Sequence, residues 1–140
     1  MQERAEQAAG AYKRILIVDD EPDVIAALAC LLEDNGYLTC QARSADEAVK
    51  QLEKTPLDLI CLDIMMPGPS GIALYQRIKL DPRFKDIPAV FISGFSMARD
   101  FSGSGFRKLV PDPEVPAPQA YLGKPLEPAR LLQVIKGIIG

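Results

Sequence analysis

Histidine is absent from the 140 residues of this chain. Its absence excludes catalysis by imidazole, metal binding through imidazole and a phosphohistidine within the chain. Any nucleophile, acid, base or metal ligand must therefore come from a carboxylate, hydroxyl, thiol or amine side chain. Long hydrophobic runs are missing too, and the polar opening segment MQERAEQAAGAYKR lacks the apolar core of a signal peptide. A cytoplasmic protein is the resulting expectation.

Cysteine is scarce, with Cys30, Cys40 and Cys61 as the three thiols. Their spacing fits no zinc-ligand pattern, and an odd number argues against a disulfide framework. Apolar neighbours surround each of them. We therefore predict three buried free thiols in a reducing compartment.

The balance of 48% hydrophobic and 25% charged residues is that of one globular domain. A net charge of −3 argues against non-specific binding to nucleic acid, and nothing indicates a membrane surface. Residues 1–13 are predicted to be a polar tail, and residues 14–140 a single domain.

Strand and helix patterns alternate along that domain. The strands are apolar without a polar alternation, which is typical of a parallel sheet covered on both faces. Five such units predict an α/β, doubly wound (βα)5 sandwich. The predicted strands cover residues 14–18, 37–42, 57–62, 87–92 and 120–123, and the clearest helices cover 22–35, 72–80 and 127–139.

The stretch between Ser93 and Tyr121 breaks this rhythm. Proline removes backbone donors and ends helices, and four prolines stand here: Pro111, Pro113, Pro116 and Pro118. We predict an irregular or shortened fourth helix near residues 97–110, followed by a Pro-rich loop. This face is expected to be specialised or flexible, with Phe95, Phe101 and Phe106 partly exposed.

Polar side chains follow four of the five predicted strands. In open α/β sheets the ligand site lies beyond the carboxyl ends of the strands. The residues expected there are Asp19, Asp20 and Glu21, then Asp63, Ser93 and Lys124. Clustered carboxylates repel one another, and a hard cation such as Mg²⁺ relieves that repulsion. With a lysine and a hydroxyl beside them, the set suits phosphoryl transfer to Asp63.

Each of these residues also has a plain structural interpretation. The acids before Pro22 fit the first turn of a helix. Asp63 fits a turn, Ser93 an ordinary turn serine and Lys124 a solvated surface residue. Tyr121 fits half-buried packing. Only their joint occurrence at strand ends, in this order, favours a functional site.

Four segments carry a resemblance to a known family: ILIVDDEPD, LDIMMPGPSG, FISG and YLGKP. In this order they resemble the receiver domain of two-component response regulators, the CheY-like superfamily. The resemblance covers residues 14–139 apart from the Pro-rich stretch. It implies a five-stranded parallel sheet of order 2-1-3-4-5.

The resemblance implies a role for each matching residue. Asp63 corresponds to the phosphoacceptor. Asp20, Asp63 and the backbone carbonyl of Met65 correspond to the direct ligands of Mg²⁺ or Mn²⁺, and Asp19 to the holder of a metal-bound water.

Three further residues match functional positions of the family. Ser93 corresponds to the switch hydroxyl, Lys124 to the phosphoryl-binding lysine and Tyr121 to the aromatic switch residue. The bond between Lys124 and Pro125 is a candidate for cis geometry. The spacing from Ser93 to Lys124 exceeds the family's usual spacing by roughly two helical turns of residues. The sequence therefore does not predict whether the domain dimerises or docks partners through that region, and it does not predict the oligomeric state.

The resemblance implies a signalling module that catalyses only its own phosphorylation and dephosphorylation. Because histidine is absent, the donor is expected to be a histidine kinase, a histidine phosphotransfer protein or a small phosphodonor. Two alternatives stay open. A haloacid-dehalogenase-like phosphatase also uses an aspartate nucleophile, but it requires a second acid where Met65 stands. A receiver-like interaction module that is never phosphorylated is the other.

Overall fold

The computed structural model describes residues 12–64, 71–94 and 105–140, and the structural statements below concern those residues. Strands and helices alternate along them. The elements are β1 (Arg14–Val18), α2 (Pro22–Asp34), β2 (Leu38–Ala42), α3 (Ala45–Lys54), β3 (Leu59–Asp63), α4 (Gly71–Leu80), β4 (Ala89–Gly94), α6 (Gly105–Leu109), β5 (Ala120–Lys124) and α7 (Pro128–Ile139).

The five strands form one parallel sheet in the order β2-β1-β3-β4-β5. This confirms the predicted fold class and strand order. β1 and β3 lie inside the sheet and are buried almost throughout, whereas the edge strands β2 and β5 are mostly half-buried. Because the strands are parallel, their carboxyl ends lie together at one end of the sheet, and the candidate site lies there.

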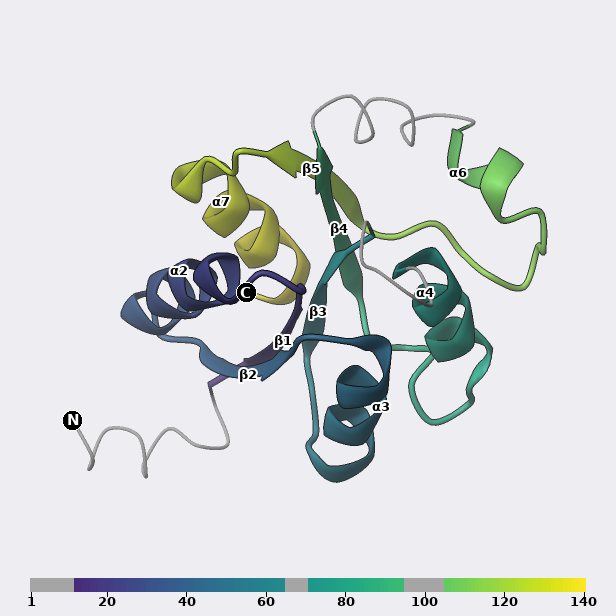
Figure 1. Ribbon diagram of the computed structural model, residues 1–140, viewed down its shortest axis with the longest axis horizontal. Coiled ribbons are helices and arrows are strands. Elements are labelled where there is room, and N and C mark those ends of the chain that lie inside the picture. Colours follow the sequence, from purple (N-terminus) through teal and green to yellow (C-terminus); the bar gives the residue numbers. More distant parts are fainter. Residues whose placement is uncertain (1–11, 65–70, 95–104) are drawn as a thin grey trace.

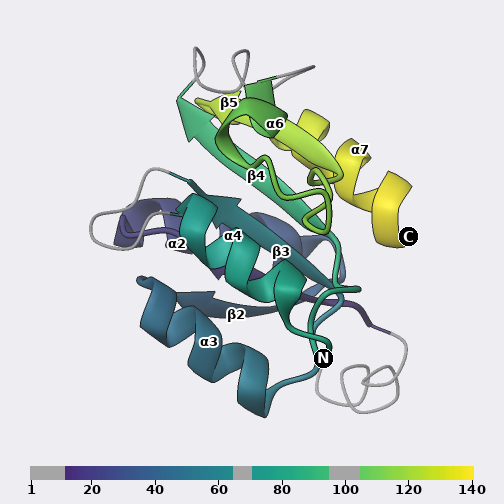
Figure 2. The same ribbon diagram turned by 90° about the vertical axis from the view of Figure 1, so that its right-hand side faces the viewer.

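Helices cover both faces of the sheet (Figure 1). Helices α2 and α7 lie on one face, and α3, α4 and α6 lie on the other, which Figure 2 turns toward the viewer. Each face has its own apolar cluster. Leu28, Leu32 and Leu131 belong to the first cluster, and Leu52, Leu74 and Phe106 to the second.

Local sequence sets the helix ends. Helix α2 begins at Pro22, whose fixed φ suits the first helical position. Past its end, Gly36 adopts a φ of +91°, which favours glycine. Helix α3 begins after Ser44, whose hydroxyl accepts a hydrogen bond from the Glu47 backbone N–H and so caps the first turn.

Several strand boundaries differ from the predicted ones by one or two residues. The second strand begins at Leu38, because the N–H of Tyr37 bonds to the carbonyl of Leu32 and closes the preceding helix. The fourth begins at Ala89, because the N–H of Ile87 is used in a turn onto Phe84. An apolar residue in the sequence indicates burial and not strand structure. Tyr37 and Ile87 both pack in the core, although neither lies in a strand.

The region before β5 is better packed than predicted. Helix α6 has five residues, and residues 110–119 contain neither helix nor strand. Phe106 was expected to be partly exposed but is 2% exposed, because it lies against Tyr75 of α4 and Phe91 of β4. Phe95 and Phe101 lie outside the described residues.

The prediction of three buried thiols is correct only for Cys61. Cys40 is half-buried on the edge strand β2. Cys30 is exposed, because it lies on the side of α2 that faces away from the sheet. Within the described ranges, no helix is long and apolar enough to cross a membrane.

Candidate functional site

Lys124 joins two carboxylates at the carboxyl edge of the sheet. Its Nζ lies 3.0 Å from Asp19 Oδ2 and 3.4 Å from Asp63 Oδ2. Asp19 follows β1, Asp63 ends β3 and Lys124 ends β5. Three strands thus bring one cation and two anions together, as the strand-end argument predicts.

The two carboxylates are buried, Asp19 with 2% and Asp63 with 3% of its surface exposed. Burial acts to lower the pKa of Lys124. Its hydrogen bonds to Asp19 and Asp63 and their negative charges outweigh that effect, so the pKa is raised above its ordinary value. Lys124 therefore stays a cation, and it balances part of the negative charge of the site.

Asp20 and Glu21 extend the acidic cluster. One ligand atom from each of Asp19, Asp20 and Glu21 lies within 4.8 Å of the others. Asp19 Oδ1 accepts a hydrogen bond from the backbone N–H of Glu21 at 2.9 Å, which fixes the turn between β1 and α2. The Glu21 side chain is 63% exposed, and its Oε1 lies 3.6 Å from Lys124 Nζ.

This donor set fits a hard divalent cation. Carboxylate oxygens are the ligands that Mg²⁺ prefers, and soft thiol ligands are absent from the cluster. Asp63 is linked to this cluster by Lys124, which pairs with both Asp19 and Asp63. The backbone carbonyl of Met65, a predicted ligand, lies outside the described residues.

Ser93 lies on β4 and Tyr121 on β5. Ser93 is 2% exposed and is paired in register with Gly123, next to Lys124. Tyr121 is half-buried, and its ring meets that of Phe91 edge to face at 5.8 Å. The structure therefore places the two predicted switch residues on β4 and β5, the strands on the far side of β3 from β1. The bond between Lys124 and Pro125 is cis, as predicted.

Gly71 is a site residue that the sequence reasoning missed. It begins α4, and a Cβ at this position would lie 2.5 Å from the carbonyl oxygen of Asp63. Only glycine lets the helix approach the backbone of Asp63 so closely. A glycine standing directly before an apolar helical pattern was the available signal.

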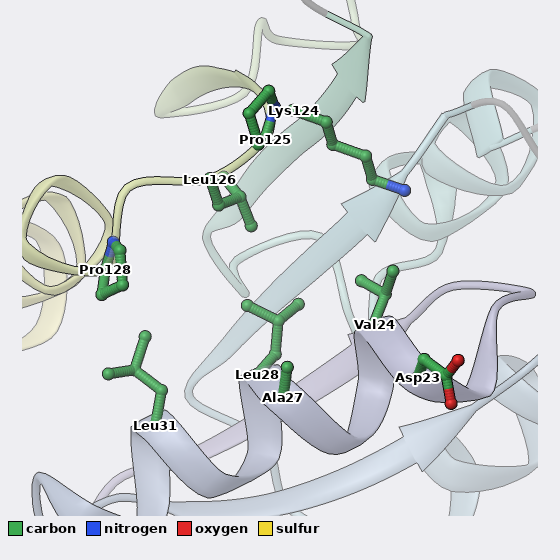
Figure 3. Close-up of a pocket in the computed structure, with 9 residues that line it drawn as sticks. All are labelled: Asp23, Val24, Ala27, Leu28, Leu31, Lys124, Pro125, Leu126 and Pro128. Carbon is green, nitrogen blue, oxygen red and sulfur yellow. The ribbon is translucent and has the colours of Figure 1, made fainter.

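A groove of about 360 Å³ lies next to Lys124, between α2 and the loop that joins β5 to α7. Figure 3 shows Val24, Leu28 and Leu31 of α2 facing Leu126 and Pro128 across it. Its walls are mainly apolar. The groove thus adjoins the site through Lys124, and apart from Lys124 and Asp23 no charged side chain lines it.

The sequence model of the response regulator receiver domain matches residues 15–105. The chain belongs to this family. Receiver domains of the family generally bind Mg²⁺ in an acidic pocket, and they interact with histidine kinases or histidine phosphotransfer proteins.

Individual relatives agree with this assignment. The chain is 35% identical over 127 residues to the phosphate regulon transcriptional regulatory protein PhoB of Escherichia coli (strain K12), covering 91% of this chain and 52% of the relative. It is 31% identical over 126 residues to response regulator Rre1 of Synechocystis sp., covering 89% and 51%. The chain therefore spans about half the length of these curated relatives.

Among solved structures, the receiver domain of a signal transduction histidine kinase from Syntrophus aciditrophicus superimposes with a TM-score of 0.75. The two sequences are 31% identical, and the match covers 91% of this chain and 89% of the other. Receiver domains similar to this one thus occur both in regulators and in kinases.

Proposed function

We propose that this chain is a phosphoacceptor receiver domain in which Asp63 takes a phosphoryl group from a partner phosphohistidine. The observation that carries the proposal is the position of Lys124, whose ammonium lies between the buried carboxylates of Asp19 and Asp63. A fixed cation beside a buried carboxylate is what a transferring phosphoryl group requires. Family membership supports the same chemistry.

In the proposed step, a carboxylate oxygen of Asp63 attacks the phosphorus atom. The phosphorus–nitrogen bond of the donor breaks, and its electron pair stays on the donor imidazole. The product is a carboxyl–phosphate anhydride on Asp63. Lys124 then pairs with a phosphoryl oxygen, and Ser93 donates a hydrogen bond to another.

Asp20, Asp63 and the backbone carbonyl of Met65 are the proposed direct ligands of Mg²⁺, or of Mn²⁺ in its place, with Asp19 holding a metal-bound water. When bound, the ion neutralises charge on the phosphoryl oxygens. The acidic cluster of Asp19, Asp20 and Glu21 supports this assignment.

The proposed output is a switch in a protein-binding surface. Phosphorylated Asp63 draws the Ser93 hydroxyl inward, and the Tyr121 ring moves from its half-buried position to a more buried one. The surface of the fourth and fifth βα units changes with it. Charge-assisted hydrogen bonds to the phosphate favour the second state.

We further propose that residues 14–140 form the receiver unit and that it works in the cytoplasm, where it meets a histidine kinase or a histidine phosphotransfer protein. The unit acts as a signalling module and turns over no separate substrate. Neither nucleic acid nor membrane is a direct partner in this proposal. The negative net charge supports the first exclusion.

Labelling with radioactive acetyl phosphate and Mg²⁺ tests the phosphoacceptor. The wild-type protein should incorporate acid-stable, alkali-labile label, and Asp63→Asn should incorporate none. Asp46→Asn, which changes an exposed aspartate on α3, is the matched control and should label like wild type. Retained labelling of Asp63→Asn would overturn the assignment.

Two further measurements separate the alternatives. Sustained turnover of p-nitrophenyl phosphate would favour the phosphatase, and we expect none, because Met65 stands where that family places its second acid. Calorimetric titration with Mg²⁺ should show binding that Asp20→Asn weakens. A receiver-like module that is never phosphorylated would show neither Mg²⁺ binding nor labelling.

A further inference from the structure

Tyr75 is a buried tyrosine on α4 that contacts the irregular segment before β5. Its side chain is 1% exposed, and its hydroxyl donates a hydrogen bond to the backbone carbonyl of Pro116. The two residues are far apart in sequence. The bond therefore ties α4, the helix that follows the Asp63 loop, to the Pro-rich stretch.

The ring of Tyr75 is also at the centre of an aromatic cluster. It meets Phe91 edge to face with centroids 4.7 Å apart, and Phe106 edge to face at 5.9 Å. Phe91 in turn meets Tyr121 at 5.8 Å. One buried ring thus contacts both α6 and the strand residue that packs against the Tyr121 ring.

Residues 105–119, which we call the cover segment, are bonded within themselves and to β4. Arg107 Nη1 donates to the carbonyls of Val110 at 3.0 Å and Asp112 at 2.6 Å, which fixes the shape of the segment. Gln119 bonds to Ala89 twice: its N–H donates to the Ala89 carbonyl, and its Oε1 accepts from the Ala89 N–H. Two side chains of the segment, Val110 and Val115, are fully buried in the apolar cluster on this face of the sheet.

We propose that Tyr75 is a positioning residue that holds the cover segment on the sheet and couples its packing to the Tyr121 ring. The hydroxyl fixes Pro116, while the ring sets the space beside Phe91 that Tyr121 can enter. A change at Tyr121 then shifts the cover segment, because the Phe91 ring contacts both Tyr121 and Phe106 of the segment. This inference rests on the proposed function for the role of Tyr121, but the attachment of the segment does not depend on phosphorylation.

The attachment is tested by amide hydrogen exchange on the full chain. Tyr75→Phe removes only the hydroxyl and leaves the ring. We expect the amides of Val115 and Gln119 to exchange roughly five- to tenfold faster, since a hydrogen bond stabilises the closed segment modestly. The amides of Ile17 and Leu62 in the central strands should keep their protection, which shows that the variant folds.

Tyr37→Phe is the matched control. Tyr37 is buried in the cluster on the opposite face of the sheet, so its change should leave exchange in the cover segment as in wild type. Tyr75→Leu removes the ring as well and should accelerate exchange further. If Tyr75→Phe matches wild type and only Tyr75→Leu differs, packing alone holds the segment and the proposed role of the hydroxyl is wrong.

The coupling is tested with fluorotyrosine-labelled protein and beryllium fluoride, a mimic of an acyl phosphate, in the presence of Mg²⁺. The Tyr121 fluorine resonance, assigned through Tyr121→Phe, should shift in wild type, and the shift should shrink by about half or more in Tyr75→Phe. An unchanged shift in Tyr75→Phe overturns the coupling and leaves the proposed function standing. A wild-type protein that shows no response to beryllium fluoride counts against the proposed function, while the exchange result still decides the attachment.

Discussion

Gly71, the first residue of α4, packs against the backbone of Asp63 so closely that a Cβ would lie 2.5 Å from the Asp63 carbonyl oxygen and 2.5 Å from the Ile64 Cα. Backbone atoms on both sides cannot yield as a flexible side chain would. Gly71→Ala should therefore destabilise the protein by about 1–3 kcal/mol, the usual cost of overpacking. It should also displace Asp63 and slow labelling by acetyl phosphate.

Gly137→Ala is the control for that change. Gly137 lies inside α7 with nothing within 4 Å of a built Cβ. This substitution should stabilise the protein by about 0.5–1 kcal/mol, because alanine loses less backbone entropy in a helix. Urea denaturation of both variants measures the difference. Equal effects of the two substitutions would show that the contact with Asp63 does not matter.

Lys124→Gln should remove the cation that two buried carboxylates share. Breaking a buried ion pair by deleting one partner typically costs about 3–5 kcal/mol, and since the Lys124 side chain is 25% exposed, we expect a cost of about 2–3 kcal/mol. Mg²⁺ should restore part of this loss, because a divalent cation stabilises whichever state binds it.

Denaturation with and without Mg²⁺ measures both effects. The stabilisation by Mg²⁺ should be larger in Lys124→Gln than in wild type. Lys136→Gln, an exposed lysine on α7, should behave as wild type. A smaller Mg²⁺ effect in Lys124→Gln would mean that the lysine helps to form the metal site and does not compete with the ion.

The sequence predicted the fold and the composition of the site because both depend on local patterns. Apolar runs define the inner strands, and parallel pairing brings their carboxyl ends to one edge. Asp19, Asp63 and Lys124 follow from that alone, and their contacts agree with it. The roles assigned to these residues stay predictions until labelling and metal binding are measured.

Contacts between distant segments could not be predicted in the same way. Nothing near Tyr75 or Pro116 in sequence indicates that they meet. The irregular stretch before β5 suggested a specialised or flexible face with Phe106 partly exposed, whereas Phe106 is buried. The exposure of Cys30 was missed for a related reason. Apolar neighbours in sequence do not surround a helical residue in space, since they lie on different sides of the helix.

The three thiols should react with Ellman's reagent at very different rates. Cys30 is exposed and should react first. Burial raises the pKa of Cys40, an effect that the charges of Arg14 and Lys54 partly offset, so it should react more slowly. Burial raises the pKa of Cys61 to about 12, so it should react only after unfolding. Cys30→Ser should abolish the fast phase; a fast phase that survives this change would place a different thiol at the surface.

Lys79 should make the stability of the protein rise with pH relative to a variant without it. Its side chain is buried on α4, and its ammonium donates to the carbonyls of Lys85 and Ile87. Burial lowers the pKa of Lys79 below its ordinary value of 10.5, and the charge of Asp86 offsets only part of that effect.

The direction of the pH effect follows from this shift. Between the lowered folded-state pKa and 10.5, the unfolded chain binds the proton more tightly than the folded one. Stability from this group is therefore lost as pH falls through the folded pKa and is fully present above 10.5. Tyr75, whose ring centroid lies 5.7 Å from the ammonium, stays neutral in this range because burial raises its own pKa.

Urea denaturation at several pH values between about pH 8 and pH 10.5 measures the effect, because an ordinary lysine titrates near the top of that range. The free energy of unfolding of wild type should rise relative to that of Lys79→Met across the range. Lys85→Met, which changes an exposed lysine of the neighbouring loop, should run parallel to wild type. A difference between wild type and Lys79→Met that stays constant with pH would show that the ammonium keeps its ordinary pKa, so that its hydrogen bonds to the two carbonyls fully offset its burial.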